Sequence, residues 1–492
     1  MIIPSSSPGL RRLATCAALA CTCAAAAVAH GQQVITLQQA IEMAQRQSPQ
    51  ARMALSSREG ARQRNRGFNA RLLPQISLNG NVPSYNRSIV GVLQPDGTQL
   101  FTPLQQTNAN LALQLQQQIP FTGGTFAVQS LVSQVQLSGS QQYKNFATTP
   151  FLFQLTQPIL QPNEQRWGIR EQTLSIDIAE RTYLEQRENI AIATTGVFFD
   201  FYSARLTLRN AVANAAVNDT LYTLNKGRFE VGKIGENDLL QSELALLRAR
   251  AAVDQAQLEF NRALAALRIA INVPPSTPLD IVVTPDVPDF TVDTVVAVQQ
   301  ALRNQSLTSQ LEFNDVDARR RIAEARLGGG PRATVVASYG VNQTSPDFAN
   351  AYRSPLEAQA FSLSINSPLV LWGAHSADVQ AAQADRERIT SNNTILRAQA
   401  GQNALFAALG IGQSRRVLII SAKADTVGAK RYEVAYNRYV IGRIGFDVLY
   451  LAQQEKDAAL QAYVSALRAY WQAYYTLRLL TLYDFEKGAP IR

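Results

Sequence analysis

The residue types that bind metals or act as nucleophiles are scarce in this chain of 492 residues. It has 3 cysteines and 2 histidines, whereas a zinc or iron site needs about three or four such ligands. The cysteines all lie near the start of the chain, at Cys16, Cys21 and Cys23. The histidines, His30 and His375, are far apart in the sequence. The sequence therefore argues against a metalloenzyme or a His-dependent hydrolase, and we expect no enzymatic activity and no cofactor.

Charged residues recur instead at two glycine-bounded turns, Gly232-Lys-Ile-Gly235 and Gly442-Arg-Ile-Gly445. Each turn has a base after its first glycine and an acid shortly after its second. These residues are Lys233 and Asp238 in the first turn, and Arg443 and Asp447 in the second. An acid in the first turn of a helix complements the helix dipole, which is a sufficient structural reason for the pattern. A functional reason depends on the elements that carry the turns.

Residues 1–29 have the layout of a secretory signal peptide. Two arginines precede an uncharged, alanine-rich run that ends in the small-x-small site Ala27-Val28-Ala29. The run is about 17 residues long, which is short for a membrane-spanning helix of about 20 residues. We therefore expect residues 1–29 to be removed on export. A lipoprotein signal with Cys21 as the lipidated residue is the alternative, although Ala18 stands where such signals usually have leucine.

The two halves of the chain repeat the same features in the same order. Ala40-Ile-Glu-Met-Ala44 corresponds to Ala297-Val-Gln-Gln-Ala301, and Pro74 corresponds to Pro331, both at an offset of 257 residues. A later proline and the Gly-x-Ile-Gly turns recur at an offset of 210, so the first half has 47 additional residues. This order indicates an internal duplication. The expected segments are repeat 1 at 30–272, a proline-rich linker at 273–288, repeat 2 at 289–487 and a tail at 488–492.

Alternation of apolar and polar residues predicts β-strands after each of the two matched prolines. The alternating segments lie at 75–79, 111–115, 125–137 and 151–155 in repeat 1, and at 335–341 and 361–365 in repeat 2. The polar positions carry Gln, Ser, Asn and Thr rather than Lys or Glu. Such strands fit a soluble sheet that is buried on one side. They also fit an outer-membrane barrel with lipid outside and water inside.

Long helices decide between these two alternatives. Residues 163–231 and 374–441 contain no proline and have a sustained helical pattern, and each segment would be roughly 100 Å long at 1.5 Å per residue. A second helix is expected after each turn, at 237–271 and 446–483. Such helices do not fit inside one compact globule and indicate a rod or tube with lengthwise packing. No later uncharged stretch approaches about 18 apolar residues, so we expect no membrane-spanning helix.

With these elements in order, the sequence resembles the TolC family of outer-membrane efflux proteins over nearly everything after the signal peptide. The motifs that carry the resemblance are Ile35-Thr-Leu-Gln-Gln-Ala-Ile-Glu-Met-Ala44 with Ser48-Pro49, Leu73-Pro74, Gln157-Pro158-Ile159-Leu160, Arg228-Phe-Glu-Val-Gly232 and Arg438-Tyr-Val-Ile-Gly442. The resemblance implies an α+β membrane protein in which strands of three copies close one shared β-barrel. A long α-helical, coiled-coil tunnel would continue this barrel through the periplasm.

The same resemblance implies a function. The protein would be the outer-membrane exit duct of a tripartite efflux or type I secretion system in a Gram-negative bacterium. Its partners would be two further copies of the chain, outer-membrane lipid, a periplasmic adaptor protein and an inner-membrane pump, with no nucleic acid. A periplasmic coiled-coil scaffold and a self-contained porin are the alternatives. The sequence leaves open whether drugs, metals or a polypeptide leave through the duct.

The 47 additional residues of repeat 1 depart from the family's pattern. Two alternating runs are joined by a segment that contains Gly123-Gly124, which favours a hairpin, at about 109–142. Both ends of a repeat are periplasmic helices, so its number of strands must be even, and a hairpin keeps that parity. Either the chain contributes six strands, eighteen in the trimer, or the hairpin lies outside a twelve-stranded barrel. A slip of the alternation near Leu131 favours the second placement.

The resemblance also implies roles for the residues at the turns. In the family, the periplasmic helix ends close the tunnel with aspartate rings and with links that involve tyrosine and arginine. By motif, Asp447 corresponds to the first gate aspartate, Tyr439 to the linking tyrosine and Arg443 to the linking arginine. Asp238 is the acid of the other turn. Tyr450 stands where a second gate aspartate is expected, so we hypothesise a single acidic ring with an aromatic constriction. The residues expected to dock the adaptor are Gly232, Lys233, Gly235, Gly442 and Gly445.

Overall fold

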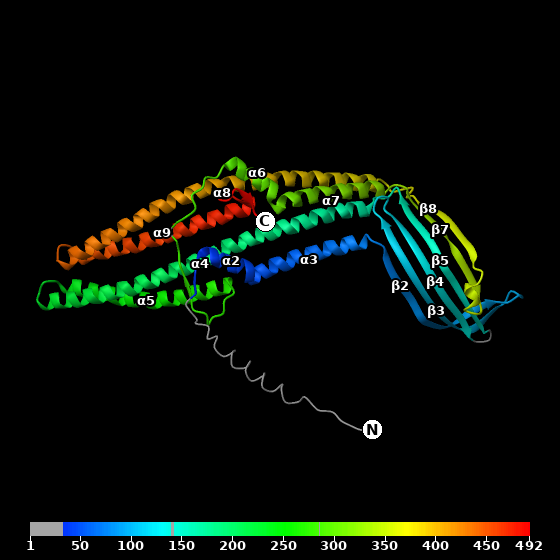
Figure 1. Ribbon diagram of the computed structural model, residues 1–492, viewed down its shortest axis with the longest axis horizontal. Coiled ribbons are helices and arrows are strands. Elements are labelled where there is room, and N and C mark those ends of the chain that lie inside the picture. Colours follow the sequence, from blue (N-terminus) through cyan, green and yellow to red (C-terminus); the bar gives the residue numbers. More distant parts are fainter. Residues whose placement is uncertain (1–32, 139–141, 285) are drawn as a thin grey trace, which may run out of the picture. The chain divides into compact units, whose positions relative to one another are not determined.

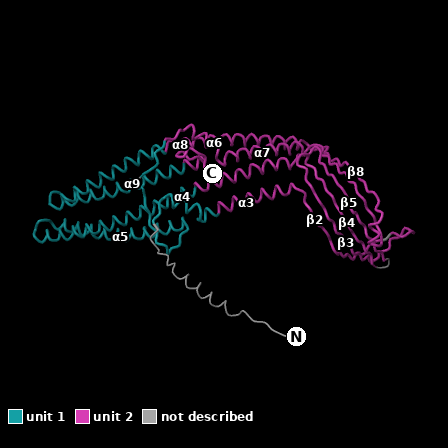
Figure 2. The backbone as a smooth tube through the Cα atoms, viewed as in Figure 1, with its two compact units in different colours: residues 1–52, 189–290, 411–476 teal, residues 53–188, 291–410, 477–492 magenta. Residues whose placement is uncertain are grey.

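The computed structural model describes residues 33–138, 142–284 and 286–492. The expected signal peptide and Cys21 lie outside the described residues. The chain divides into two compact units, each made of three segments of the sequence (Figure 2). Unit 1 comprises residues 1–52, 189–290 and 411–476, and unit 2 comprises residues 53–188, 291–410 and 477–492. Each unit therefore combines residues of both expected repeats.

Unit 2 contains a six-stranded antiparallel sheet (Figure 1). Its strands are β2 (Gln75–Leu93), β3 (Gln99–Ile119), β4 (Gly124–Ser138), β5 (Tyr143–Ile159), β7 (Arg332–Ser345) and β8 (Leu356–Asn366). They lie in the order β2-β3-β4-β5-β7-β8. Because β5 pairs with β7, strands from both expected repeats share one continuous sheet. A 3-10 helix, η1 (Asn350–Tyr352), lies between β7 and β8 in the sequence.

The expected placement of the extra hairpin outside the sheet is wrong, because β3 and β4 lie within it. β3 pairs with β2 on one side and β4 on the other, and β4 pairs with β5. The register of β4 against β5 shifts between Gln129 and Leu131, opposite Thr149 to Leu152. Such a shift is a β-bulge, which changes the phase of alternation without ending the pairing. The extra residue lies in β5, whereas β4 keeps a continuous register with β3 from Gly124 to Ser138. The slip near Leu131 therefore moves apolar side chains of β4 to the other face without removing the strand from the sheet, and the chain contributes six strands.

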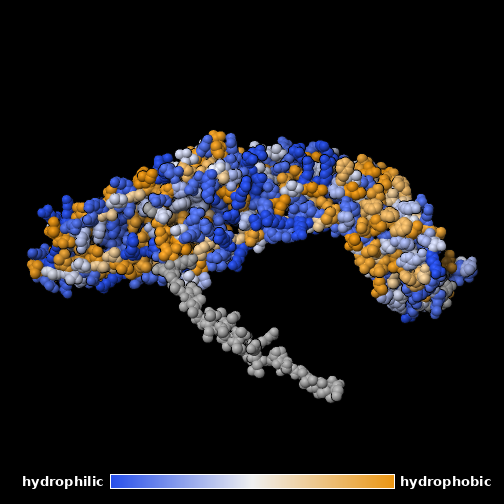
Figure 3. Space-filling model, viewed as in Figure 1, coloured by the Kyte–Doolittle hydropathy of each residue, from blue (hydrophilic) through white to orange (hydrophobic). Residues whose placement is uncertain are grey.

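The strand register gathers apolar side chains on one face of the sheet. Residues directly opposite each other point to the same side of a sheet. The cross-strand pairs on this face include Ile76 with Leu115, Leu78 with Leu113, Val128 with Phe153, Phe153 with Tyr339 and Ala337 with Phe361. Several of these side chains are well exposed, such as Ile76 and Phe361, each at 71%. Figure 3 shows hydrophobic residues gathered over these strands.

The turn between β3 and β4 is tied to the start of a long helix, α4 (Glu164–Glu230). Asn163 Nδ2 donates hydrogen bonds to the carbonyl oxygens of Pro120 and Phe121, at 2.9 and 3.2 Å. Its Oδ1 accepts a hydrogen bond from Arg166 N at 3.0 Å, which caps the helix. Gly123 in this turn has a φ of 79°, a conformation that favours glycine. One side chain thus holds both the turn and the helix N-terminus.

The remaining elements of unit 2 are mostly helices, which pack beside α4. They are α3 (Pro49–Arg71, which begins in unit 1), α6 (Thr294–Asn304), α7 (Ser306–Gly328), the first part of α8 (Ala374–Val440), β9 (Tyr483–Asp484) and β10 (Ala489–Pro490). Arg320 of α7 pairs with Glu171 of α4 at 2.6 Å. Arg478 bridges two buried acids, Glu188 at 3.0 Å and Asp484 at 2.5 Å. These ion pairs hold α7 against α4, and they hold the end of α9 against α4 and β9.

Unit 1 contains the two helical hairpins with their glycine-bounded turns. Its elements are β1 (Gln33–Ile35), α2 (Leu37–Gln47), the second part of α4, α5 (Glu236–Ala270), β6 (Leu279–Ile281), the second part of α8 and most of α9 (Phe446–Thr481). Thr36 and Gln39 form a capping box at the start of α2. β1 and β6 pair in parallel. α4 and α8 have 67 residues each, in agreement with the long helices expected from the sequence.

One described helix, α8, contains an 18-residue window that is long and apolar enough to cross a membrane by length and composition alone. Of this window, 22% is buried. A core helix of a soluble protein passes the same test, so this observation carries no assignment. The strands, rather than α8, present the exposed apolar face described above.

Candidate functional site

The two glycine-bounded turns have the same backbone structure. Gly232 and Gly442 have φ values of 71° and 76°, the left-handed conformation that favours glycine. Gly232 N donates to Phe229 O and Lys233 N to Arg228 O, both at 2.8 Å. Gly442 N and Arg443 N make the equivalent pair of bonds at 2.9 Å. This is the Schellman ending of a helix, so each motif stops α4 or α8 at a defined residue.

The acids after the turns lie at the N-termini of α5 and α9. Asp238 is exposed in the first turn of α5, and Asp447 is exposed in the first turn of α9. A methyl group added at Gly445 would overlap Oδ1 of Asp447, so the carboxylate of Asp447 lies against the backbone where α9 begins. Both positions suit the positive end of a helix dipole. The structure is thus compatible with the structural reason given for these acids.

The two turns line one cavity of about 650 Å³. Lys233 and Asp238 of the first turn and Asp447 of the second contribute to its wall. Gly442 and Gly445 also line this cavity. The other turn residues of interest, Gly232, Gly235 and Arg443, are exposed outside its lining. The fold therefore brings the charged residues of two turns that are about 200 residues apart in the sequence to one place.

Tyr439 joins α8 to α4 inside unit 1. Its side chain is 4% exposed, and its hydroxyl donates a hydrogen bond to Asn225 Oδ1 at 2.9 Å. Arg228 lies over the Tyr439 ring, with its guanidinium carbon 5.5 Å from the ring centroid, and donates to the carbonyl oxygen of Val440 at 3.3 Å. The tyrosine expected to be a link is therefore bonded within its own chain. No sequence pattern marked Asn225. Arg228 was recognised only as part of the motif that ends at Gly232, without a role of its own.

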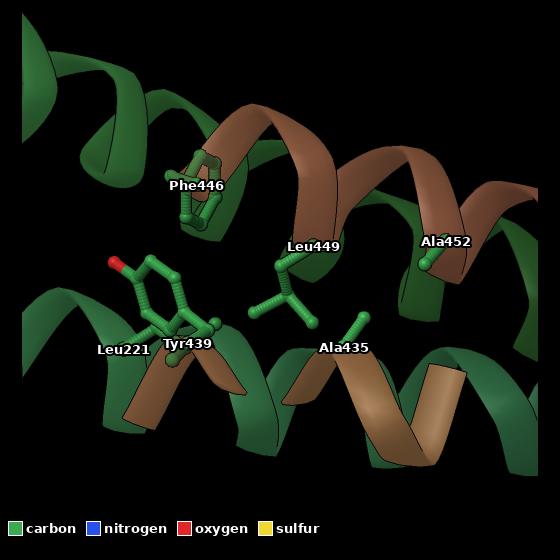
Figure 4. Close-up of a cluster of buried hydrophobic side chains, with 6 residues drawn as sticks. All are labelled: Leu221, Ala435, Tyr439, Phe446, Leu449 and Ala452. Carbon is green, nitrogen blue, oxygen red and sulfur yellow. The ribbon is translucent and has the colours of Figure 1, made fainter. Parts of the chain in front are cut away.

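An aromatic cluster supports Tyr439 from the α9 side. The cluster of buried residues consists of Leu221, Ala435, Tyr439, Phe446, Leu449 and Ala452 (Figure 4). The rings of Tyr439 and Phe446 lie 6.1 Å apart, edge to face. Figure 4 shows these two side chains extending toward each other from α8 and α9. The first turn of α9 is therefore packed directly against the last turn of α8.

Tyr450 lies one helical turn after Phe446 and stacks on it, with ring centroids 6.2 Å apart. It is half-buried against the aromatic cluster. It lines a second cavity, of about 510 Å³, formed by residues of α4, α5 and α9. Asn214 and Asp457 of this second cavity share a hydrogen bond of 2.8 Å. Tyr450 therefore lies beside the cavity of the turns rather than in its wall, and the aromatic constriction stays a prediction.

No ion pair involves Asp238, Arg443 or Asp447 within the described part of the chain. The charges at the turns are thus available to solvent or to other molecules. The described residues contain no group of three or more His, Cys, Asp or Glu that could hold a metal ion. The helix ends thus carry exposed acidic and basic side chains next to the buried cluster that contains Tyr439 and Phe446.

No protein-family profile matches the chain. Protein CyaE of Bordetella pertussis is 24% identical over 223 residues, which span 45% of this chain and 47% of that protein, about half of its length. The CmeC outer membrane channel of Campylobacter jejuni superimposes with a TM-score of 0.66 and 16% identity, covering 92% of this chain and 86% of CmeC. The outer membrane protein VceC of Vibrio cholerae gives 0.62 and 15%, covering 93% and 97%. The MtrE outer membrane channel of Neisseria gonorrhoeae gives 0.61 and 16%, covering 90% and 88%.

Proposed function

Because this chain has the fold of TolC-like outer-membrane channels, we propose that it is a passive exit duct. It resides in the outer membrane of a Gram-negative bacterium, extends into the periplasm and serves a tripartite efflux or type I secretion system. The observation that carries the proposal is the sheet of unit 2. One face is apolar and well exposed, and the other carries amides and hydroxyls.

Closure of a barrel requires further copies of the chain. β2 and β8 are the two edges of the sheet, and neither has a partner on its outer side among the described strands. Unpaired edges cannot face lipid, so membrane-spanning sheets close. β2 begins after α3 and β8 precedes α8, so both edges start or end at the helical side and run antiparallel. The edge β8 of one copy can therefore pair with β2 of the next, and three copies complete the barrel.

The helix ends at the glycine-bounded turns form the gate. Asp238 and Asp447 are exposed at helix N-termini beside one cavity, and their charges would form an acidic ring in a trimer. Tyr439 holds the α8 end against α4 through Asn225 and so favours the closed position of the α8–α9 hairpin. An open state is described for MtrE, which supports a gated duct rather than a fixed pore.

The partners are an adaptor protein in the periplasm and a pump in the inner membrane. A passive duct does no work on its cargo, so directed export through it requires an energy source in another protein. The docking surface consists of the exposed turn residues Gly232, Lys233, Gly235, Gly442 and Gly445.

Planar-bilayer recording of the purified full chain tests this function. An exit duct should insert as a channel that is mostly closed alone and opens when the turns are perturbed. A self-contained porin would instead conduct steadily without a partner. A periplasmic scaffold would produce no current and would not extract with the outer membrane, and either of these results would overturn the proposal.

A further inference from the structure

The polar face of the six-stranded sheet has almost no charge. Side chains on this face follow from the strand register, since paired residues point to the same side. The face carries amides and hydroxyls such as Asn110, Gln114, Gln116, Gln129, Gln154 and Ser338. Among the paired residues of the six described strands, Arg332 is the one charged side chain on this face, and it lies at the start of β7.

The sheet also has more strands than the twelve-stranded family pattern requires. Three sheets of six strands contribute eighteen. Barrel diameter grows roughly in proportion to strand number. With strands about 4.8 Å apart and tilted by about 40°, eighteen strands give a backbone diameter of about 36 Å, against about 24 Å for twelve. β3 and β4 belong to the wall along their whole paired length, so they widen the barrel rather than fill it.

From these two observations we propose that the outer-membrane outlet is a wide and electrically neutral passage suited to a polypeptide chain. A polypeptide carries charges of both signs, and an almost uncharged wall neither attracts nor repels either sign. The sheet itself would therefore not select by charge, whereas exposed carboxylates lie at the helix ends near Asp238 and Asp447. This inference rests on the proposed function, because it requires that three copies form a duct.

Two neighbouring positions on β3 test which face lines the passage. Gln114 and Leu113 are adjacent and point to opposite faces. The cysteines of the sequence all lie in the expected signal peptide, at Cys16, Cys21 and Cys23, so an introduced cysteine would be unique in the mature chain. A charged, membrane-impermeant thiol reagent should change the conductance of Gln114→Cys channels by severalfold more than that of Leu113→Cys channels. Equal modification of both, or of Leu113→Cys alone, would overturn the assignment of the faces.

Width and neutrality are tested in the same bilayers on the Asp238→Asn/Asp447→Asn double variant. Neutral polymers of graded size, added on the sheet side, should enter up to about one and a half times the diameter admitted by a twelve-stranded barrel. The reversal potential in a salt gradient should lie near zero, and acidic and basic unstructured peptides of equal length should block the current equally often. A twelve-strand size limit, persistent charge selectivity, or exclusion of one peptide contradicts this inference. The absence of any channel contradicts the proposed function itself.

Discussion

In the proposed gate, the hydroxyl of Tyr439 is the contact that holds the end of α8 against α4, through Asn225. Tyr439→Phe keeps the ring in the aromatic cluster but leaves the buried Asn225 Oδ1 without its donor. An unsatisfied buried acceptor costs about 1–3 kcal/mol. We therefore expect a lower unfolding temperature and more frequent openings in single-channel records.

Tyr436→Phe is the matched control for this change. Tyr436 packs against the same aromatic cluster, and its hydroxyl makes no hydrogen bond to any described residue. Its loss should leave both the unfolding temperature and the opening frequency nearly unchanged. If both substitutions open the channel equally, the hydrogen bond to Asn225 does not hold the gate.

In the proposed gate, the exposed carboxylate of Asp447 is the charge that we expect to select ions. Asp447→Asn keeps the size of the side chain but removes its charge. We expect weaker cation selectivity, measured as a reversal potential in a salt gradient, and weaker block by multivalent cations. Asp254→Asn, an exposed acid farther along α5, should change neither quantity. Unchanged selectivity in Asp447→Asn would remove this residue from the gate.

The sequence located these residues unequally, for a physical reason. Tyr439 and Asp447 lie in motifs around a glycine that ends a helix, so local pattern was sufficient to find them. Asn225 lies 214 residues before its partner Tyr439, and nothing in its own surroundings marks it. A contact between helices that are distant in the sequence depends on how the helices pack. A local sequence pattern does not determine that packing.

At the scale of elements, glycines in different conformations should respond in opposite directions to alanine. Gly442→Ala forces a left-handed residue to carry a Cβ, which costs about 1 kcal/mol although the space around it is open. Gly227→Ala lies inside α4, where a Cβ also meets nothing within 4 Å, and should stabilise by about 0.5–1 kcal/mol. Thermal unfolding of both variants tests this. The same sign for both would show that the turn does not require its glycine conformation.

The segment before α6 is tied to α8 by an ion pair with a defined pH dependence. The hydrogen bond from Arg415 lowers the pKa of Asp289 below its ordinary value. A lowered folded-state pKa stabilises above the unfolded pKa of about 4, and the effect is lost as the pH falls through the folded value. Asp289→Asn should therefore lower the unfolding temperature at pH 7 more than at pH 3. Asp254→Asn serves as the control, and a larger effect at pH 3 would contradict the account.

The sequence predicted the types of elements well and their pairing less well. Uninterrupted helical patterns identified the two 67-residue helices because no proline or strand signal competes within them. The extra hairpin was recognised as two strands, but the phase slip near Leu131 was interpreted as a departure from the sheet. β4 instead stays in continuous register with β3 on both sides of Leu131, so the slip only moves apolar side chains to the other face of the sheet. Whether a strand keeps its pairing through such a change depends on its neighbours and cannot be read from that strand alone.

At the scale of the whole molecule, we propose that a single chain is incomplete as a channel. Its sheet has two open edges and one face of exposed apolar side chains. When three copies close a barrel in lipid, each open edge pairs with a neighbouring copy and the apolar face contacts lipid. The same closure would bring three sets of turns, each with Asp238 and Asp447, around one axis.

The most direct test is the protein mass of the detergent-extracted, full-length complex, measured by light scattering with the detergent contribution subtracted. We expect three chains in each particle. A monomer, or a dimer, would mean that the six strands do not close a shared barrel. The duct, its acidic gate and its wide neutral outlet would then all be contradicted.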